Sequence, residues 1–133
     1  MVDDDGSGRQ RRVRTLIIDD DEDMRMLAAS VIRIANDGLE VVGTAADGES
    51  GLAKWRELRP DVVVVDHRMP GATGLDVAEQ MLTEVPAQSI ILFSAYLDDG
   101  VTDAAEQIGI CSILEKDRFN DLPSALWSCA AGW

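Results

Sequence analysis

Four consecutive valines, Val62 to Val65, are the feature that most restricts the fold of this 133-residue chain. A β-strand turns alternate side chains to opposite faces of its sheet, so an unbroken apolar run places hydrophobic groups on both faces. Both faces must then be covered, as they are in parallel sheets with helices above and below. The run ends directly in Asp66, and an ionised carboxylate beside a buried strand is costly unless it is paired or binds a metal.

The rest of the chain repeats one unit, a short apolar strand followed by an amphipathic helix. Five such units favour an α/β fold, a doubly wound five-stranded parallel sheet in a single domain. We predict strands at about 13–19, 40–45, 62–66, 89–94 and 111–115. The first helix carries its apolar face on Met24, Leu27, Ala28, Val31 and Ile32. The other helices are predicted at about 49–58, 74–85, 99–108 and 120–130.

Composition restricts the class of partner. The formal net charge is −13, which argues against direct nucleic-acid binding and against docking onto anionic lipid. The chain has no run of 18 apolar residues, so we expect no membrane span. Residues 1–12 are polar and Gly-Ser-rich and are predicted to form a flexible leader to a domain at 13–131.

The two cysteines, Cys111 and Cys129, match no metal or redox motif. Both fall in predicted apolar elements, where a free thiol behaves as a small hydrophobic group. We therefore expect free thiols and a reduced, cytoplasmic protein.

Polar side chains end four of the five predicted strands. Asp19 and its two acidic neighbours end the first strand, Asp66 the third, Ser94 the fourth and Lys116 the fifth. Ligands of open α/β sheets bind outside the carboxyl ends of the strands. In a sheet of order 2-1-3-4-5 these four strands are neighbours, so their polar ends would meet on one rim.

This combination of side chains suits phosphoryl chemistry. Crowded carboxylates repel one another, and a divalent cation with oxygen ligands, such as Mg²⁺, relieves the repulsion. Ser94 offers a hydroxyl donor and Lys116 a mobile positive charge, which together with a metal can hold a phosphoryl group. Asp66 is central among them and is the candidate nucleophile, because a carboxylate can form an acyl phosphate.

Each residue also has a simpler interpretation. Asp19 to Asp21 could form the N-cap and first turn of the first helix, where acids favour the helix dipole. Ser94 alone could be a loop hydroxyl, and Lys116 alone a surface lysine. His67, the only histidine, is interpreted as an exposed loop residue rather than a catalytic base.

Four segments in this order and spacing resemble the receiver domain of two-component response regulators, over about residues 13–131. They are LIIDDDEDMR (16–25), VVVVDHRMPGATGLD (62–76), ILFSA (91–95) and ILEKD (113–117). The resemblance implies a flavodoxin-like sheet of order 2-1-3-4-5. It also implies that Asp66 accepts a phosphoryl group from the phosphohistidine of a sensor histidine kinase or phosphotransfer protein.

The same resemblance assigns the metal site. Asp19 and Asp20 are similar to the acidic pair that binds Mg²⁺, with Asp20 the direct ligand. Asp66 and the backbone carbonyl of Arg68 would complete the protein ligands.

The phosphoryl group has its own set of residues by this resemblance. Ser94 matches the switch hydroxyl and Lys116 the lysine that pairs with the phosphoryl group. The backbone N–H groups of His67 and Ala95 would bind phosphoryl oxygens.

Two departures from the family pattern affect the expected switch. The family often has an aromatic residue where this chain has Ile113, so a readout by aromatic rotation is in question. Arg68 and Tyr96 stand two residues after Asp66 and Ser94, where bulky side chains can shield the phosphoryl group from water. We expect this pair to slow hydrolysis of the acyl phosphate.

Three functions are considered for these residues, and they differ in whether Asp66 is phosphorylated. The first is a phosphoacceptor that signals to an output protein, or through a homodimer, by the face of helix 99–108, strand 111–115 and helix 120–130. Such a protein catalyses its own phosphotransfer and slow dephosphorylation and is not a turnover enzyme. The second is a phosphorylation-independent interaction or dimerisation module, which Ile113 favours. The third, an aspartyl phosphatase, is disfavoured because Arg68 stands where such enzymes have a second aspartate.

Overall fold

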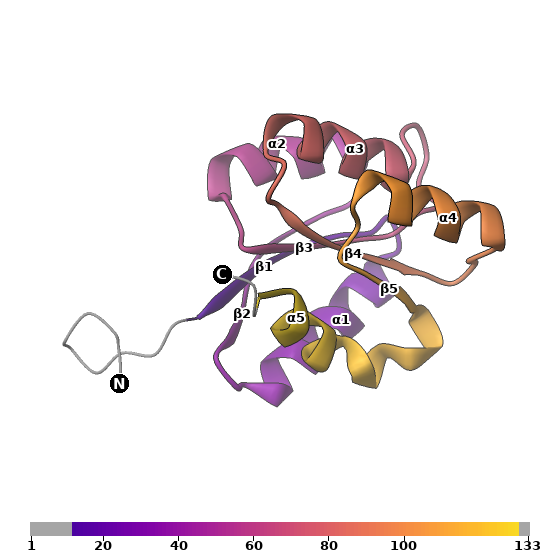
Figure 1. Cartoon of the computed structure of the whole chain (residues 1–133). Helices are drawn as coiled ribbons and strands as arrows, with labels where there is room; N and C mark the ends of the chain where they lie inside the picture. The colour runs from indigo at the N-terminus through magenta and orange to yellow at the C-terminus, as the bar shows by residue number, and fades with distance from the viewer. Residues whose placement is uncertain (1–11, 131–133) are drawn as a thin grey trace.

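The computed structural model describes residues 12–130, which form one five-stranded sheet with helices on both faces (Figure 1). All neighbouring strands are parallel, and their order is β2-β1-β3-β4-β5. The predicted fold class and strand order are therefore confirmed. The predicted leader falls almost wholly outside the described residues. The strands are β1 (Val13–Ile18), β2 (Leu39–Ala45), β3 (Val62–Val65), β4 (Ser89–Ser94) and β5 (Ser112–Glu115).

The helices form two layers (Figure 1). Helices α1 (Glu22–Ala35) and α5 (Leu122–Ala130) cover one face of the sheet. Helices α2 (Gly48–Leu58), α3 (Gly74–Glu84) and α4 (Asp99–Ile108) cover the other. Within residues 12–130, none of these helices combines the length and apolar character needed to cross a bilayer.

The valine strand lies where its sequence predicts. Val62 and Val64 pack in the hydrophobic cluster beneath α1 and α5, and Val63 and Val65 pack in the cluster on the opposite face. None of the four is more than 1% exposed. Alternation of side chains in an unbroken apolar strand thus joins two separate cores through the centre of the sheet.

The loop after β3 is closed by a glycine. The N–H of Gly74 donates to the carbonyl of His67 at 2.8 Å. A Cβ atom at Gly74 would lie 2.8 Å from the carbonyl carbon of Asp66 and 2.8 Å from the Cα of His67. Both are backbone atoms that cannot rotate away, so only glycine permits α3 to begin this close to Asp66.

The segment between β5 and α5 differs from the sequence prediction. A 3₁₀ helix, η1, occupies Lys116–Asp121, and α5 begins at Leu122 rather than near Asn120. Pro123 lies in the first turn of α5, where the missing N–H of proline costs no intrahelical hydrogen bond. The short 3₁₀ segment has no apolar periodicity of its own, so the sequence pattern does not predict it.

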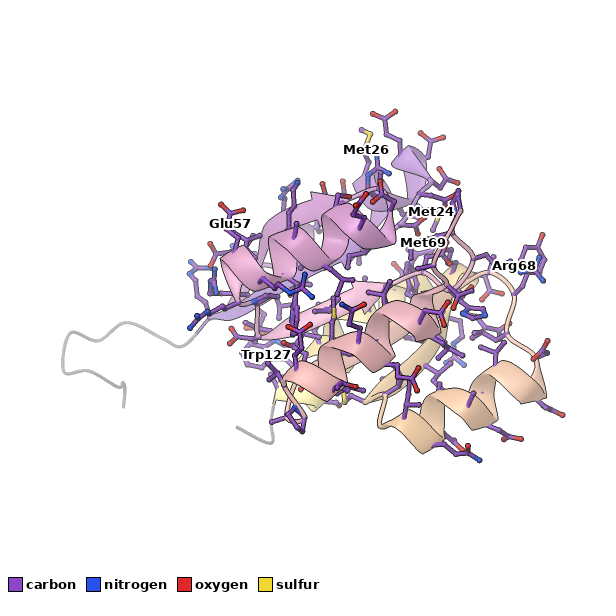
Figure 2. All side chains as sticks on the ribbon, turned by 90° about the horizontal axis from the view of Figure 1, so that it is seen from above. Met24, Met26, Glu57, Arg68, Met69 and Trp127 are labelled. Atoms are coloured by element: carbon purple, nitrogen blue, oxygen red, sulfur yellow. A yellow bond between two sulfur atoms is a disulfide. The ribbon has the colours of Figure 1, made fainter. Side chains whose placement is uncertain are left out.

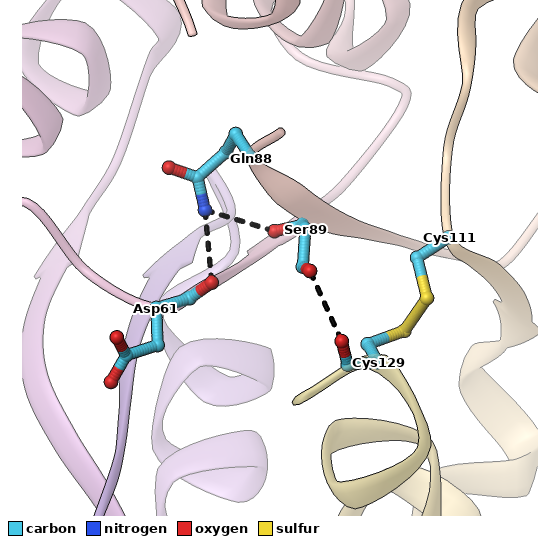
Figure 3. Close-up of a disulfide and its surroundings, with 5 residues drawn as sticks. All are labelled: Asp61, Gln88, Ser89, Cys111 and Cys129. Atoms are coloured by element: carbon cyan, nitrogen blue, oxygen red, sulfur yellow. Dashed lines mark hydrogen bonds between the residues drawn. A yellow bond between two sulfur atoms is a disulfide. The ribbon is translucent and has the colours of Figure 1, made fainter. Parts of the chain in front are cut away.

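The expectation of free thiols is wrong. Cys111, just before β5, forms a disulfide with Cys129 in the last turn of α5, with a Cα–Cα distance of 6.0 Å (Figure 3). The partners are 18 residues apart in sequence, and only the return of α5 across the sheet brings them together. The expectation of a reducing compartment depended on free thiols, so it loses that support.

Candidate functional site

The site begins with two buried carboxylates that follow neighbouring strands. Asp19 comes directly after β1 and Asp66 directly after β3, and they are only 3% and 5% exposed. Their backbones continue the sheet, because the N–H of Asp66 donates to Ile18 at 2.9 Å and that of Asp19 to Ala45 at 3.0 Å. The pairing of β1 with β3 therefore fixes these two acids side by side.

One lysine bridges both acids. Lys116 follows β5, and its Nζ lies 2.7 Å from an Asp19 carboxylate oxygen and 3.3 Å from an Asp66 oxygen. Burial alone would lower the pKa of Lys116, but the hydrogen bond to Asp19 and the two negative charges outweigh burial and raise it. The lysine is therefore held in its charged form.

The pKa of Asp19 is also raised, but for a carboxyl group this favours the neutral form. Burial raises the pKa of its carboxyl, and the charge of Asp66 raises it further. The hydrogen bonds from Lys116 and from the N–H of Asp21, the latter at 2.9 Å, offset this rise only in part. A single ammonium thus does not fully offset the burial of the Asp19 carboxylate, and a second positive charge would be stabilised here.

The acidic cluster provides a place for that charge. Carboxylate oxygens of Asp19, Asp20 and Asp66 lie within 4.8 Å of one another. Asp20 is exposed, so the cluster is open to solvent on one side. An all-oxygen donor set with room for water ligands fits Mg²⁺.

The simpler interpretation of the acidic run holds for one of its members. Asp21 is the N-cap of α1, and its side chain accepts hydrogen bonds from the N–H groups of Asp23 at 2.9 Å and Met24 at 3.4 Å. Asp19 and Asp20 instead belong to the acidic cluster. Three consecutive aspartates thus have two distinct structural roles.

A cavity of about 260 Å³ opens above the acids. The hydroxyl of Ser94 is buried at its wall and, among residues 12–130, has no hydrogen-bond partner. Since buried polar groups are nearly always paired, this hydroxyl is suited to a ligand oxygen. The cavity is lined by Asp20, Asp21, Asp66, Arg68, Ser94, Ala95, Tyr96 and Lys116.

Two large side chains form the outer rim of this cavity. The guanidinium carbon of Arg68 lies 4.6 Å from the centre of the Tyr96 ring, a cation–π contact. Tyr96 is 65% exposed. Arg68 projects outward from the loop after β3, whereas the neighbouring Met69 is buried (Figure 2).

Not every predicted site residue lies at the cavity. Ile113 is half-buried in β5, packs against the core beneath α2 to α4, and lines a different groove between α4 and β5. The imidazole of His67 is half-buried rather than exposed, and its Nδ1 atom has no partner among the described residues. The backbone roles assigned to His67, Arg68 and Ala95 stay predictions.

One supporting residue escaped sequence analysis. Arg25 donates from its guanidinium to the carbonyl of Asp19 at 2.7 Å and so holds the backbone at the end of β1. It lies one turn into α1, where the charge pattern indicates only a solvated helix face.

Comparison with known proteins gives a consistent result. A family model described as "Response regulator receiver domain" matches residues 15–126. The transcriptional regulatory protein LiaR of Bacillus subtilis is 35% identical over 121 residues, covering 90% of this chain and 57% of LiaR. A protein-glutamate methylesterase/protein-glutamine glutaminase of Anaeromyxobacter dehalogenans is 38% identical over 110 residues, covering 83% of this chain and 32% of that protein.

Solved structures match over nearly the whole chain. The signal receiver domain of NarL from Mycobacterium tuberculosis superimposes with a TM-score of 0.85 at 30% identity, covering 93% of this chain and all of that one. The response regulator domain of CheB from Thermotoga maritima gives a TM-score of 0.79 at 27% identity, covering 92% and 96%. The chain spans about a third to just over half the length of the curated relatives named above.

Proposed function

Because this chain belongs to the response regulator receiver domain family, we propose that it is a phosphoacceptor whose acceptor is Asp66. The phosphoryl group would come from the phosphohistidine of a sensor histidine kinase or a phosphotransfer protein. The observation that carries the proposal is the contact of Lys116 with two buried carboxylates, at 2.7 and 3.3 Å, beneath a cavity open to solvent. An ion pair that served only stability would not need that cavity.

The transfer is a single displacement at phosphorus. A carboxylate oxygen of Asp66 forms the new O–P bond while the N–P bond of the donor phosphohistidine breaks, and its electron pair returns to the imidazole nitrogen. Lys116 is within reach of the reacting carboxylate and would pair with a phosphoryl oxygen. The Ser94 hydroxyl and the N–H groups of His67 and Ala95 would donate to the remaining oxygens.

The Mg²⁺ site would consist of the carboxylates of Asp19, Asp20 and Asp66 and the backbone carbonyl of Arg68. When bound, the ion supplies positive charge next to the phosphoryl oxygens. This assignment is supported by the close approach of the three carboxylates and by the raised pKa of Asp19.

The signal would leave through the face of α4, β5 and α5. A groove of about 500 Å³ lies between α4 and β5, with Leu97, Ile110 and Ile113 among its apolar residues and Glu106 and Glu115 among its charged ones. Rotation of the Ser94 hydroxyl toward the phosphoryl group would bias the loop that leads into α4. An output protein or a second copy of the chain would read that shift in the groove.

A mass measurement tests the acceptor. The full chain is incubated with Mg²⁺ and acetyl phosphate, and its intact mass is compared with those of Asp66→Asn and Asp37→Asn. Asp37 is an exposed aspartate next to the end of α1 and serves as the matched control. We expect one phosphoryl adduct on the wild type and the control and none on Asp66→Asn. An adduct that persists on Asp66→Asn would contradict the assignment.

A second candidate is a phosphorylation-independent interaction module. It is favoured by Ile113, which stands where an aromatic switch is common and lies in the α4–β5 groove. It predicts that no phosphodonor modifies the chain and that partner binding or self-association is equal in wild type and Asp66→Asn. Rapid repeated release of phosphate would instead indicate a phosphatase.

A further inference from the structure

The Cys111–Cys129 disulfide (Figure 3) closes a loop that contains β5, η1 and nearly all of α5. β5 lies at the edge of the described sheet and is hydrogen-bonded to β4 on one side. Just before it, the N–H of Cys111 donates to Ile90 at 2.8 Å. The disulfide is therefore a covalent attachment between an edge strand and the helix that covers one face of the sheet.

The two turns of α5 nearest η1 are held by core packing. Leu122 and Leu126 are fully buried in the core beneath α1 and α5. The last turn is held by the disulfide, by the burial of Cys129 and Ala130, and by the Ser89 hydroxyl, which donates to the Cys129 carbonyl at 3.1 Å. Opening the disulfide would thus release the last turn of α5 and the start of β5 while the rest of the helix stays packed.

The two cysteines differ in exposure. Cys129 is 6% exposed, whereas Cys111 is exposed and lies on the wall of the α4–β5 groove. An attacking thiolate must reach a sulfur atom to exchange with the disulfide. Access therefore favours attack at the Cys111 side.

We propose that this disulfide is a thiol-exchange site at which a dithiol reductant opens the link between β5 and α5, loosening one wall of the α4–β5 groove. This goes beyond phosphoacceptor function and does not depend on it. The redox state of the pair would set how firmly the edge of the sheet is held.

The exchange balances without a further reactant. One thiolate of the dithiol attacks Sγ of Cys111, the S–S bond breaks, and Cys129 leaves as a thiolate that takes up a proton. The second thiolate of the reductant then attacks the reductant sulfur that is bonded to Cys111. The mixed disulfide breaks, and Cys111 is released as a thiolate that takes up a proton. The protein gains two electrons and two protons, and the dithiol is oxidised to a cyclic disulfide.

Alkylation and hydrogen exchange test the proposal. The oxidised full chain is treated with dithiothreitol without denaturant, its free thiols are alkylated with iodoacetamide, and its intact mass is measured. We expect two alkyl groups per chain. Deuterium uptake in the reduced chain should be about tenfold faster at residues 110–115 and 127–130, where local opening becomes easier. Uptake at the central strand, residues 62–65, should remain the slowest in both redox states, because those amides exchange only through global unfolding.

Serine variants of the two cysteines test the local release and the difference in thiol access separately. The double variant Cys111→Ser/Cys129→Ser should show the fast uptake with no reductant present. Cys129→Ser, which keeps the exposed thiol, should be alkylated faster than Cys111→Ser, which keeps the buried one. If the serine variants do not fold, the reduced wild-type chain provides the same test, through its deuterium uptake and the separate alkylation rates of Cys111 and Cys129. A disulfide reduced only after denaturation, or equal uptake in both redox states, would overturn the proposal.

Discussion

Strand β5 is held differently at its two ends. Its carboxyl end leads to Lys116, which is fixed by charge between Asp19 and Asp66, whereas its other end is fixed by the covalent bond of Cys111 to Cys129. A charge contact responds to any new anion or cation nearby, but a disulfide responds only to thiol chemistry. One short strand therefore joins two restraints that different chemical events can release.

The two ends of β5 also differ in what they should affect, since one lies at the candidate site and the other contributes to stability. The Lys116 end lies in the candidate site, where the ammonium only partly offsets the burial of Asp19. The Cys111 end lies away from that cavity and restrains a loop in the unfolded chain as well. Changes at the first end should alter phosphorylation, and changes at the second should alter unfolding.

The largest expected effect follows from removing the charge at the first end. Lys116→Met should slow phosphorylation by acetyl phosphate by about 100-fold or more, because a positive group aimed at the developing charge is lost. The rate is measured from the adduct mass over time, with circular dichroism to establish that the variant is folded. The Cys111→Ser/Cys129→Ser variant should keep a near wild-type rate. A comparable loss in both variants would contradict the separation of the two ends.

Removing the disulfide at the other end of β5 should chiefly lower the stability of the fold. The double serine variant should lose about 3 kcal/mol of unfolding free energy, since the disulfide closes a loop across an 18-residue separation. Urea denaturation with and without dithiothreitol measures this loss. The reductant should destabilise the wild type and leave the variant unchanged. Equal denaturation midpoints in oxidised and reduced wild type would show that the bond does not stabilise the fold.

A smaller effect should appear in the pH dependence. The pKa of Asp19 is raised above its ordinary value of 3.8, so its contribution to stability is fully present below pH 3.8 and is lost as pH rises through the raised folded value. Without Mg²⁺, Asp19→Asn should therefore unfold at a higher temperature than wild type near pH 7, with the difference vanishing toward pH 3. Added Mg²⁺ should stabilise the wild type more than the variant. Scanning calorimetry in EDTA and in Mg²⁺ checks both signs.

The smallest expected effect concerns the rim of the cavity. If Arg68 and Tyr96 shield the phosphoryl group from water, Arg68→Asn/Tyr96→Ala should lose it about three- to tenfold faster. The decay of the adduct mass after removal of acetyl phosphate measures the lifetime. The matched control is Arg118→Asn, an exposed arginine paired with Asp121 beyond β5. A decay rate equal to wild type would show that the stacked pair does not shield the phosphoryl group.

Sequence patterns were most informative where local physics and burial agree. The valine run and the alternation of strand and helix predicted the parallel sheet, because an apolar strand has to be covered on both faces. The polar ends of four strands then predicted which residues share a rim. The sequence did not reveal the 3₁₀ helix at Lys116–Asp121 or the support of Asp19 by Arg25, because neither has a periodic signature.

The sequence by itself determined the fold class and the polar residues that end four of the strands, and its resemblance to receiver domains implied the strand order. The fold class and the strand ends follow from hydrophobic periodicity, which is a local property of the chain. Only the tertiary structure decided which acid Lys116 approaches most closely, that Ser94 is left without a partner among the described residues, and that Cys111 meets Cys129. Distances between side chains on different elements depend on how those elements pack, and local sequence patterns do not record that packing.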